Sequence, residues 1–394
     1  MKHVLWCIGH DLLLPEIERG EGCYVYDRDG RKYLDLESGV WCTPLGHNHP
    51  EVNRALKAQA ERLMHMGYCY SGRIVEEAAA DLLDISGLSD GKAVFLSSGS
   101  EAVEFGVQAI REITGKPLVL TLSESFLGSY GSAGSKRPEE WHLFDRSVCL
   151  TCERISVCDP QCPHLTGIPF GRIGGFVFEP GSSSGLVRFP PRPLIQNLVK
   201  LVCRHGGIIQ INEITTGMGR TGRWFGYQHY GIRPDIISLG KGLGNGYPVS
   251  AILLTRKIST RLRRISFHYS QSHQNDPLGC AVVQAVVSVM KAGKIVEKSR
   301  RMGKYFQEKL LQLKEKYPII REVRGRGLIV VVEFQETLPA GLIDDWHRQL
   351  IGKGFIVARR PGVNAFRMDP PLIITKEEID SFLTAFGDVM NSAV

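Results

Sequence analysis

The sequence lacks any long apolar run, since no segment approaches the roughly 18 uninterrupted apolar residues of a membrane span. Its start, MKHVLWCIGHDLLLPEIERG, also lacks a signal-peptide pattern, because His10 and Asp11 break the only apolar stretch. Internal repeats and low-complexity segments are missing as well. We therefore expect a cytoplasmic protein with no membrane partner.

An excess of one charge is also missing, because the formal net charge is only +7 over 394 residues. The densest basic run, from Arg256 to Ser266, has no interleaved aromatic residues and no nucleic-acid-binding motif beside it. A solvated helix face explains such a run better than a nucleic-acid patch does. We predict no nucleic-acid partner.

Disulfides are not expected among the ten cysteines, because a cytoplasmic chain keeps its thiols reduced. Four cysteines crowd into the stretch CLTCERISVCDPQC, at Cys149, Cys152, Cys158 and Cys162. Their spacing fits a structural zinc ion in a tetrahedral thiolate site, and it fits equally four reduced thiols that pack a small loop. Neither interpretation puts a metal in an active site.

What the sequence does contain is a series of short, continuous apolar runs separated by helical patterns. These runs predict strands at Ala93–Leu96, Leu118–Leu122, Gly174–Glu179, Gly207–Asn212, Asp235–Leu239 and Val249–Leu254. Because the runs do not alternate with polar residues, both faces of their sheet should be buried, which is typical of a mostly parallel sheet. Ligands of such open sheets bind beyond the carboxyl ends of the strands.

The two ends of the chain have other patterns. Gly22 to Leu36 predicts two short strands around a turn at Arg28–Gly30, and a helix is expected from about Glu51 to Met64. Pro277 to Tyr317 is a long amphipathic stretch, and the segment after it predicts an α+β unit. The length of the chain favours two domains.

Residues suited to chemistry follow several of the predicted strands. After Leu96, SSGSEAVE leads into a helix whose free N–H groups suit a phosphate, although Ser before Glu is also an ordinary helix cap. Phe126 stands near glycines, and Asn212 ends a strand. Lys241, in GKGLGNGYP, is either a surface lysine or one held close to a ligand, and a desolvated lysine can form a Schiff base. Together these features fit pyridoxal phosphate.

Taken in order, the motifs of this chain resemble those of the class III aminotransferases, a fold type I family of pyridoxal-phosphate enzymes that also includes dialkylglycine decarboxylase. The matching stretches are GCYVYDRDGRKYLDLESG, LGHNHPEV, FLSSGSEA, FEPGSSSG, TGMGRTG, PDIISLGKGLGNGYP, NDPLGCAV, VRGRGL and FRMDPPL. The resemblance implies an α/β fold: a large domain around a mostly parallel seven-stranded sheet, and a smaller α+β domain drawn from both termini. We expect the large domain at residues 56–285 and the small domain at residues 1–55 and 286–394.

The resemblance also implies how the chain would hold the cofactor. Lys241 matches the lysine that binds pyridoxal 5'-phosphate as a Schiff base and later moves a proton on the substrate. Gly99 and Ser100 match the phosphate-binding turn. Ser272 matches a threonine that reaches the phosphate of the neighbouring subunit, which implies a homodimer with shared active sites.

Around the pyridine ring the resemblance is incomplete. Phe126 and Ile214 match the residues on opposite faces of the ring. Family members carry Asp at the position of Asn212, Gln at the position of Thr215, which contacts the ring oxygen, and His at the position of Leu127. Asparagine can hydrogen-bond the ring nitrogen but has no charge to keep it protonated. Losing a charge-assisted bond in a buried site costs roughly 1–3 kcal/mol.

Three residues are expected to contact the substrate. Arg367 matches an arginine that binds the substrate carboxylate in part of the family, although a structural salt bridge is the other interpretation. Ser184 lies where decarboxylase-like members touch that carboxylate and where ornithine-type members carry Glu, which argues against ornithine-like diamines. Trp41, with Tyr68 and Tyr70, would form an aromatic pocket or fill a dimer interface.

The expected function is an aminotransferase that moves an amino group between an amino acid or ω-amine and a 2-oxo acid. One alternative is a racemase, aminomutase or decarboxylase on the same scaffold, with decarboxylase disfavoured because Val40 stands where that enzyme has Gln. The other is a cofactor-binding protein with reduced catalysis. Asn212 favours this last alternative, and the retained Lys241 and Arg367 oppose it.

Overall fold

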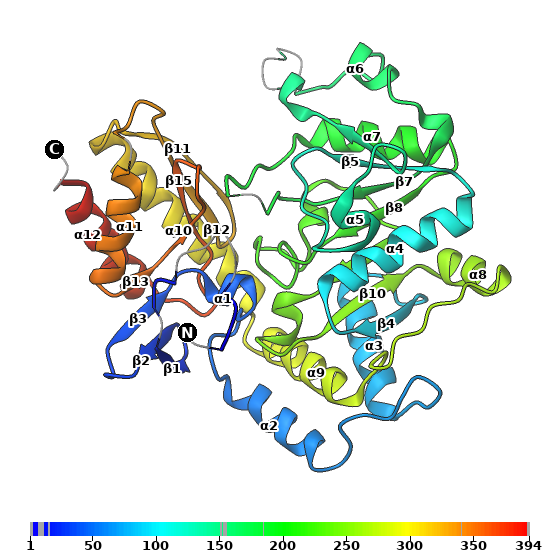
Figure 1. The fold of residues 1–394 in the computed structure, drawn as a ribbon, viewed down its shortest axis with the longest axis horizontal. Helices are drawn as coiled ribbons and strands as arrows, with labels where there is room; N and C mark the ends of the chain where they lie inside the picture. The colour runs from blue at the N-terminus through cyan, green and yellow to red at the C-terminus, as the bar shows by residue number, and fades with distance from the viewer. Residues whose placement is uncertain are drawn as a thin grey trace.

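The computed structural model describes residues 3–391 apart from residues 7–11, 15, 150–151, 153–155, 184 and 340. Its largest sheet has seven strands in the order β4-β10-β9-β8-β7-β5-β6 (Figure 1). These strands are β4 (Lys92–Leu96), β5 (Leu118–Leu122), β6 (Trp141–Phe144), β7 (Ile173–Phe178), β8 (Ile208–Asn212), β9 (Ile236–Leu239) and β10 (Ser250–Leu254). Only β10 runs antiparallel to its two neighbours, so the prediction of a mostly parallel seven-stranded sheet is confirmed.

Both faces of this sheet are covered by helices. Every residue of β5, β7, β8, β9 and β10 is buried, as the unbroken apolar runs predicted. Successive side chains of a strand point to opposite faces. Accordingly, Ile208 joins the apolar cluster of α4 (Gly99–Thr114), and Ile209 joins that of α7 (Arg192–Arg204). The edge strand β6 was not predicted, because its burial alternates and Leu143 is exposed.

The N- and C-terminal parts of the chain share a smaller sheet. It has the order β1-β2-β3-β13. β3 pairs with β13 in parallel, which joins an N-terminal segment to a C-terminal one. Its strands are β1 (Ile17–Glu21), β2 (Tyr24–Asp27), β3 (Lys32–Asp35) and β13 (Phe355–Ile356). The two strands expected around the Arg28–Gly30 turn are therefore confirmed as β2 and β3. The domain boundaries themselves stay a prediction.

A third sheet, β11-β12-β15-β14, stands against the C-terminal helices (Figure 1). It consists of β11 (Ile320–Arg326), β12 (Ile329–Phe334), β15 (Ala365–Met368) and β14 (Ala358–Arg359). The neighbouring helices are α10 (Ile295–Lys316), α11 (Leu342–Gly352) and α12 (Lys376–Asn391). An α+β arrangement in this segment is what the sequence predicted.

The remaining helices connect these sheets. The α-helices are α1 (Ser38–Trp41), α2 (Pro50–Ala60), α3 (Arg73–Ser86), α5 (Gly131–Ser135), α6 (Pro163–Thr166), α8 (Arg256–Arg264) and α9 (Pro277–Ala292). The 3-10 helices are η1 (Arg146–Cys149), η2 (Phe170–Arg172), η3 (Gly226–His229) and η4 (Lys241–Gly244). The long amphipathic stretch is two helices, α9 and α10, that meet at 64°. Within the described ranges, no single helix is long and apolar enough to cross a membrane, and this bent pair passes that test only when taken together.

The four clustered cysteines lie between β6 and β7, away from the strand ends discussed below. All four are free thiols, and Cys158 is buried. Burial, together with the neighbouring thiols, raises the pKa of Cys149 to about 11. In the described part of the chain, no three of these sulfur atoms lie within 4.8 Å of one another. No disulfide joins these four described cysteines, and both the zinc site and the packed reduced thiols stay predictions.

Candidate active site

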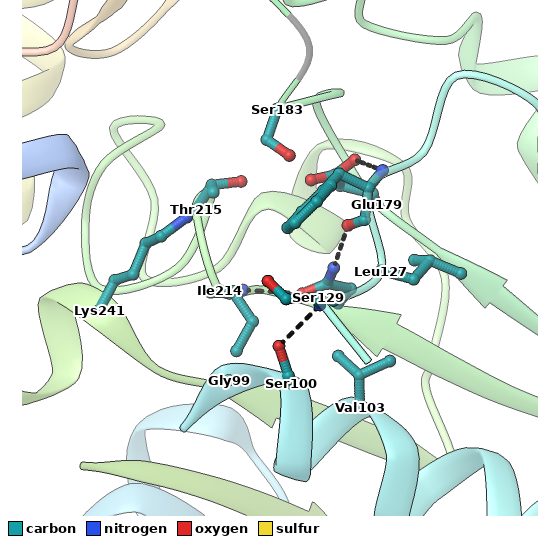
Figure 2. A pocket seen from close by; sticks show the side chains of 13 residues that line it. Gly99, Ser100, Val103, Leu127, Ser129, Glu179, Ser183, Ile214, Thr215 and Lys241 are labelled. Atoms are coloured by element: carbon teal, nitrogen blue, oxygen red, sulfur yellow. Dashed lines mark hydrogen bonds between the residues drawn. The ribbon is translucent and has the colours of Figure 1, made fainter. Parts of the chain in front are cut away.

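The polar residues that follow the strands meet at the carboxyl edge of the seven-stranded sheet (Figure 2). There they enclose a cavity of about 170 Å³. The residues that line it are Gly99, Ser100, Val103, Phe126, Leu127, Gly128, Ser129, Glu179, Ser183, Asn212, Ile214, Thr215 and Lys241. This first cavity, which we call the cofactor cavity, brings together every residue expected to hold the cofactor except Ser272, whose side chain is exposed.

The N-terminus of α4 forms one end of the cofactor cavity. Ser98 and Glu101 form a capping box, in which Ser98 Oγ accepts from the Glu101 N–H at 3.3 Å and Glu101 Oε2 accepts from the Ser98 N–H at 2.7 Å. The cap interpretation is thus confirmed, but it uses neither the N–H of Gly99 nor that of Ser100. Those two groups have no hydrogen bond to any described residue. Free N–H groups at the positive end of a helix are suited to bind an anion, so we call this pair the anion site.

A side chain at position 99 would force Ile214 to move. A β-carbon there would lie 2.9 Å from Cδ1 of Ile214, closer than unbonded carbon atoms approach. Ile214 in turn lies against Gly240, the residue before Lys241. The close approach of these segments places the anion site, an apolar side chain and the lysine around one small cavity.

Asn212 ends β8 inside the cofactor cavity and is held in one orientation. Its Nδ2 donates to the Phe126 carbonyl at 3.1 Å, and its Oδ1 accepts from the Ile214 N–H at 3.2 Å. Each amide atom keeps one further hydrogen-bonding site, so Asn212 can bond a ring nitrogen in either protonation state. Phe126 itself is 52% exposed over the cavity, whereas the Thr215 hydroxyl is buried without a partner among the described residues.

Glu179 is a buried carboxyl in this cavity that the sequence analysis did not single out. Its Oε2 accepts from the Phe126 N–H at 3.1 Å, so the backbone of Phe126 contacts both Glu179 and Asn212. Burial raises the pKa of Glu179 to about 7. The sequence could have indicated Glu179, because it directly follows β7, and the same reasoning had selected Asn212 at the end of β8.

Lys241 begins η4 with a left-handed backbone, at φ 44°. Burial lowers the pKa of its amine, and the positive charge of Arg367 adds to this effect, while Cys42 and Glu179 oppose it. Its Nζ lies 4.7 Å from the centre of the Trp41 ring. An amine that loses its proton readily is the form that attacks a carbonyl carbon. Lys241 is therefore not an ordinary surface lysine.

A second cavity of about 670 Å³, which we call the substrate cavity, opens beside the first. It is lined by Val40, Trp41, Glu124, Ser125, Phe126, Ser183, Gly185, Lys241, Arg360 and Pro361. The two cavities share Phe126, Ser183 and Lys241, so the lysine stands where they meet. Arg360 was missed because it lies in a turn after β14, where no pattern marks it.

The residues expected to contact substrate are placed differently from one another. Trp41 lines the substrate cavity, but Arg367, Tyr68 and Tyr70 do not. Tyr68 and Tyr70 are exposed on the surface. Ser184 lies outside the described residues.

Arg367 is buried against Trp41. Its guanidinium carbon lies 3.7 Å from the centre of the Trp41 ring, its Nε pairs with Asp369, and its Nη2 lies 3.7 Å from a Glu37 oxygen. The Nη1 atom has no hydrogen bond to a described residue. Arg367 thus takes part in a structural ion pair, while neither Nη1 nor Nη2 has a hydrogen bond to a described residue, so both interpretations of this residue stay open.

The turn that presents Trp41 has an unusual backbone. Residues Ser38, Gly39, Val40 and Trp41 all have positive φ, from 44° to 66°. This conformation is costly for any residue with a side chain and most of all for a β-branched one such as Val40. The Gly39 N–H donates to Asp35 Oδ2 at 3.0 Å, which helps to hold the turn.

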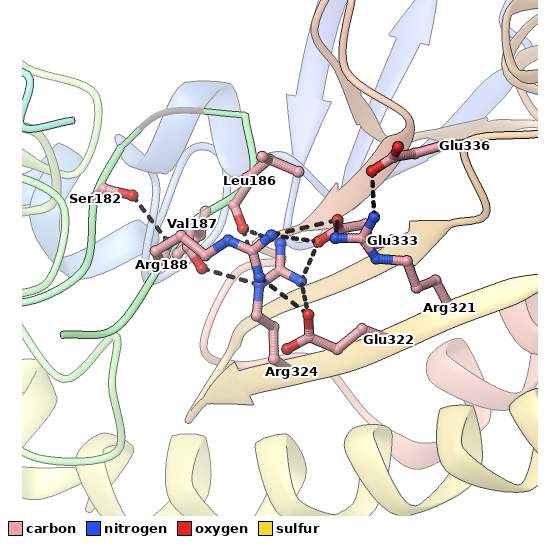
Figure 3. Close-up of polar contacts among 9 residues, drawn as sticks. All are labelled: Ser182, Leu186, Val187, Arg188, Arg321, Glu322, Arg324, Glu333 and Glu336. Atoms are coloured by element: carbon pink, nitrogen blue, oxygen red, sulfur yellow. Dashed lines mark hydrogen bonds and ion pairs between the residues drawn. The ribbon is translucent and has the colours of Figure 1, made fainter. Parts of the chain in front are cut away.

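The loop that carries Gly185 is tied to β11 and β12 by ion pairs (Figure 3). Arg188 Nη1 lies 3.0 Å from Glu322 Oε2, and Arg188 Nη2 lies 3.0 Å from Glu333 Oε2. Arg324 Nη1 lies 2.9 Å from Glu322 Oε2 and 2.5 Å from Glu333 Oε2. Because Glu333 is buried, these bonds are shielded from water and fix one wall of the substrate cavity.

The cofactor cavity has the groups that pyridoxal phosphate requires. Two free N–H groups at a helix N-terminus suit the phosphate, and a strand-end amide suits the ring nitrogen. The unpartnered Thr215 hydroxyl suits a ring oxygen, and the amine of Lys241 suits the aldehyde carbon. The residues of this chain therefore fit the cofactor that the motifs implied.

Comparison with known proteins agrees with this geometry. The family model of class III aminotransferases matches residues 8–139 and 165–390. Acetylornithine aminotransferase of Methanosarcina acetivorans is 30% identical over 392 residues, covering 100% of this chain and 94% of the relative. The same enzyme of Methanocaldococcus jannaschii is 32% identical over 390 residues, covering 94% of this chain and 92% of the relative.

Solved structures show the same fold. Acetylornithine aminotransferase from Elizabethkingia anophelis superposes with a TM-score of 0.85 at 25% identity, covering 99% of this chain and 97% of that one. An (S)-enantioselective ω-transaminase from Thermomicrobium roseum gives 0.87 at 26% identity, covering 96% and 93%. The chain therefore belongs to the class III aminotransferases, the pyridoxal-phosphate-dependent enzymes of this fold.

Proposed function

We propose that Lys241 is the residue that carries the cofactor and that the amino group passes between a carboxylate-bearing amine and a 2-oxo acid. The observation that carries the proposal is the position of Lys241, where the cofactor cavity meets the substrate cavity. One side of the lysine has an anion site, and the other side has Arg360. A phosphate and a carboxylate would thus lie on opposite sides of the reacting amine.

Each residue of the cofactor cavity has a part in this proposal. When bound, pyridoxal phosphate supplies an electron-accepting ring that stabilises negative charge on the carbon beside the amino group. The N–H groups of Gly99 and Ser100 would hold the phosphate. Asn212 would bond the ring nitrogen, and Lys241 Nζ would hold the cofactor and move the proton of that carbon.

The substrate would be recognised by its carboxylate. Arg360 lines the substrate cavity and is only partly buried, so its guanidinium is available to a carboxylate. Arg367 has two terminal nitrogens without a hydrogen bond to a described residue, but the Trp41 ring lies against its guanidinium group. The relatives named acetylornithine aminotransferases support a donor with an amine at one end and a carboxylate at the other.

We further propose a cytoplasmic homodimer in which Ser272 reaches the phosphate bound by the partner subunit. Ser272 is exposed and lines neither cavity of its own chain. Leu63, Met64, Tyr68 and Tyr70 are also exposed, and large apolar side chains gathered in one segment are typical of a surface that another copy covers.

A second candidate function is different chemistry on the same cofactor, such as racemisation. Asn212 favours it, because two backbone hydrogen bonds fix a neutral side chain where the family has a charged one. A ring nitrogen without a proton accepts electrons less readily, which slows transamination more than reactions that need less stabilisation.

Arg360→Gln tests the carboxylate site. We expect the KM for the 2-oxo acid to rise about 10- to 100-fold with kcat largely kept, because a charge-assisted hydrogen bond contributes about 1.5–3 kcal/mol. Arg348→Gln, which removes a surface arginine paired with Asp345, is the matched control and should behave as the wild type.

Arg367→Gln completes the experiment. We expect it mainly to lower the melting temperature, because Asp369 would lose its buried partner. An unchanged KM in Arg360→Gln together with a raised KM in Arg367→Gln would move the carboxylate site to Arg367. Unchanged KM values in both variants would contradict carboxylate recognition by this cavity.

A further inference from the structure

A cluster of potential metal ligands lies outside both cavities, beside the N-terminus of α9. It consists of His65, in the segment after α2, and of His273 and Asp276, in the segment before α9. His65 Nδ1 lies 2.6 Å from Asp276 Oδ1, and His273 Nδ1 lies 2.6 Å from Asp276 Oδ2. The centres of the two imidazole rings are 4.7 Å apart. Residues 211 positions apart in the sequence thus converge on one carboxylate.

We propose that His65, His273 and Asp276 bind a divalent transition-metal ion. One ligand atom from each residue lies within 4.8 Å of the others. Two donors on the same ion stand up to about 4 Å apart, since metal–nitrogen and metal–oxygen bonds are about 2.0–2.2 Å long. Side-chain movements of about 1 Å therefore bring all three atoms onto one ion.

The donor set indicates the class of ion. Imidazole nitrogens suit zinc, cobalt, nickel and copper, whereas magnesium and calcium prefer sites made entirely of oxygen. Three protein ligands leave at least one coordination position for water. None of the three residues lines the cofactor cavity or the substrate cavity of its own chain.

Binding changes the tautomer of both imidazoles. In the structure each imidazole Nδ1 donates a hydrogen bond to a different oxygen of Asp276. On binding, each ring gives up its Nδ1 proton and takes up a proton from solvent at Nε2, so both rings are neutral ligands, and two metal–nitrogen bonds and one metal–oxygen bond replace the two hydrogen bonds. Affinity therefore falls as the pH falls and the imidazoles compete for protons.

The surroundings of the cluster permit entry and keep it assembled. In the single chain the side chains of His65 and His273 are 45% and 62% exposed, and that of Asp276 is 17% exposed, so an ion reaches the site from solvent before the proposed second copy covers this surface. α2 packs directly against α9, so the two segments are held together before an ion arrives (Figure 1). A bound ion would act as a clamp between the segment after α2 and the loop that carries Ser272.

Cobalt binding tests the site, with protein from which any histidine tag has been removed. Calorimetric titration of the full chain should give one Co²⁺ per chain at this site, with the weak visible bands of nitrogen and oxygen ligation. His65→Ala and His273→Ala should each weaken binding at least about tenfold, because each removes a ligand. His268→Ala is the matched control, since His268 is exposed in the same loop but lies outside the cluster, and it should bind as the wild type does.

Cobalt on the cysteine cluster is distinguished by its spectrum, because thiolate ligands add an intense charge-transfer band. Co²⁺ should also raise the melting temperature of the wild type and of His268→Ala but not that of His65→Ala. Three results would overturn the proposal: no binding, binding with the thiolate band alone, or equal affinity in all three histidine variants.

Discussion

The two cavities that meet at Lys241 are built in different ways. The cofactor cavity takes its residues from the ends of adjacent strands and the start of α4, so the hydrogen bonds of one sheet fix its geometry. The substrate cavity takes Trp41, Gly185 and Arg360 from three separate turns, one with a positive-φ backbone and one held by ion pairs. The difference indicates that the sheet holds the residues for the chemistry shared by the family. The turns, whose sequence can change without disturbing the sheet, would set the substrate specificity.

The largest effect should come from the lysine that both cavities share. Lys241→Met should lower the amino-transfer rate at least about 1000-fold, because it removes both the covalent attachment and the group that moves the proton. It should also abolish the visible absorption of lysine-bound cofactor. Lys257→Met, which changes an exposed lysine near Asp235, is the control and should keep full activity. Substantial activity in Lys241→Met would show that the two cavities do not act through this residue.

A smaller effect should come from the ring end of the cofactor cavity. Asn212→Asp should raise the rate of the first half-reaction by about one to two decades, because it restores a negative charge beside the ring nitrogen. Stopped-flow absorbance with a competent donor measures that rate.

Asn212→Ala is the matched control for this prediction. It removes the bonds to Phe126 and Ile214 without adding charge, so it should not accelerate the reaction. If Asn212→Asp reacts no faster than the wild type, the rest of the cavity has adapted to a neutral ring.

The smallest effect should be a pH dependence of folding stability that comes from buried carboxyl groups on the cofactor side. Two buried carboxyl groups are involved: Glu179, and Glu213, the residue that follows Asn212. Burial raises the pKa of both from 4.5 to about 7. Between these values the folded chain binds more protons than the unfolded chain at these two groups, so their contribution to stability is full below pH 4.5 and is lost as the pH rises through about 7. The loss should be on the order of 1–3 kcal/mol for each group.

Denaturant unfolding at about pH 5 and about pH 8 measures this loss for the wild type and Glu213→Gln. The variant should show a smaller difference between the two pH values, since its side chain does not ionise. A wild type whose stability rises between these values, with Glu213→Gln unchanged from it, would contradict the sign of the pKa shifts.

Much of the cofactor cavity was predictable from the sequence because its residues directly follow buried strands. Apolar runs located β7, β8 and β9, and Asn212 at the end of β8 and Lys241 just past the end of β9 then marked the site. The same reasoning applied to β7 would have found Glu179. At Ser98 the sequence could not separate a helix cap from a phosphate site; the structure shows the cap, and because the cap leaves two N–H groups free, the phosphate site stays a prediction.

The substrate cavity could not be predicted in this way. Its walls come from turns whose geometry depends on distant contacts, such as the ion pairs of Arg188 with β11 and β12. The left-handed turn before Trp41 is contrary to local preference, because Val and Trp rarely adopt positive φ. Arg360 could therefore be recognised as a cavity residue only from the structure, in which the segment after β14 lies beside the turn of Val40 and Trp41.

The most direct test of the central claim is the absorption spectrum of the protein loaded with pyridoxal phosphate, recorded before and after a series of carboxylate-bearing amines and then a 2-oxo acid. We predict that at least one donor removes the band of lysine-bound cofactor and produces pyridoxamine phosphate, and that the 2-oxo acid restores the original band. Cofactor bound at Lys241 that no donor converts, in a protein that racemises one of those amines, would contradict amino transfer as the function.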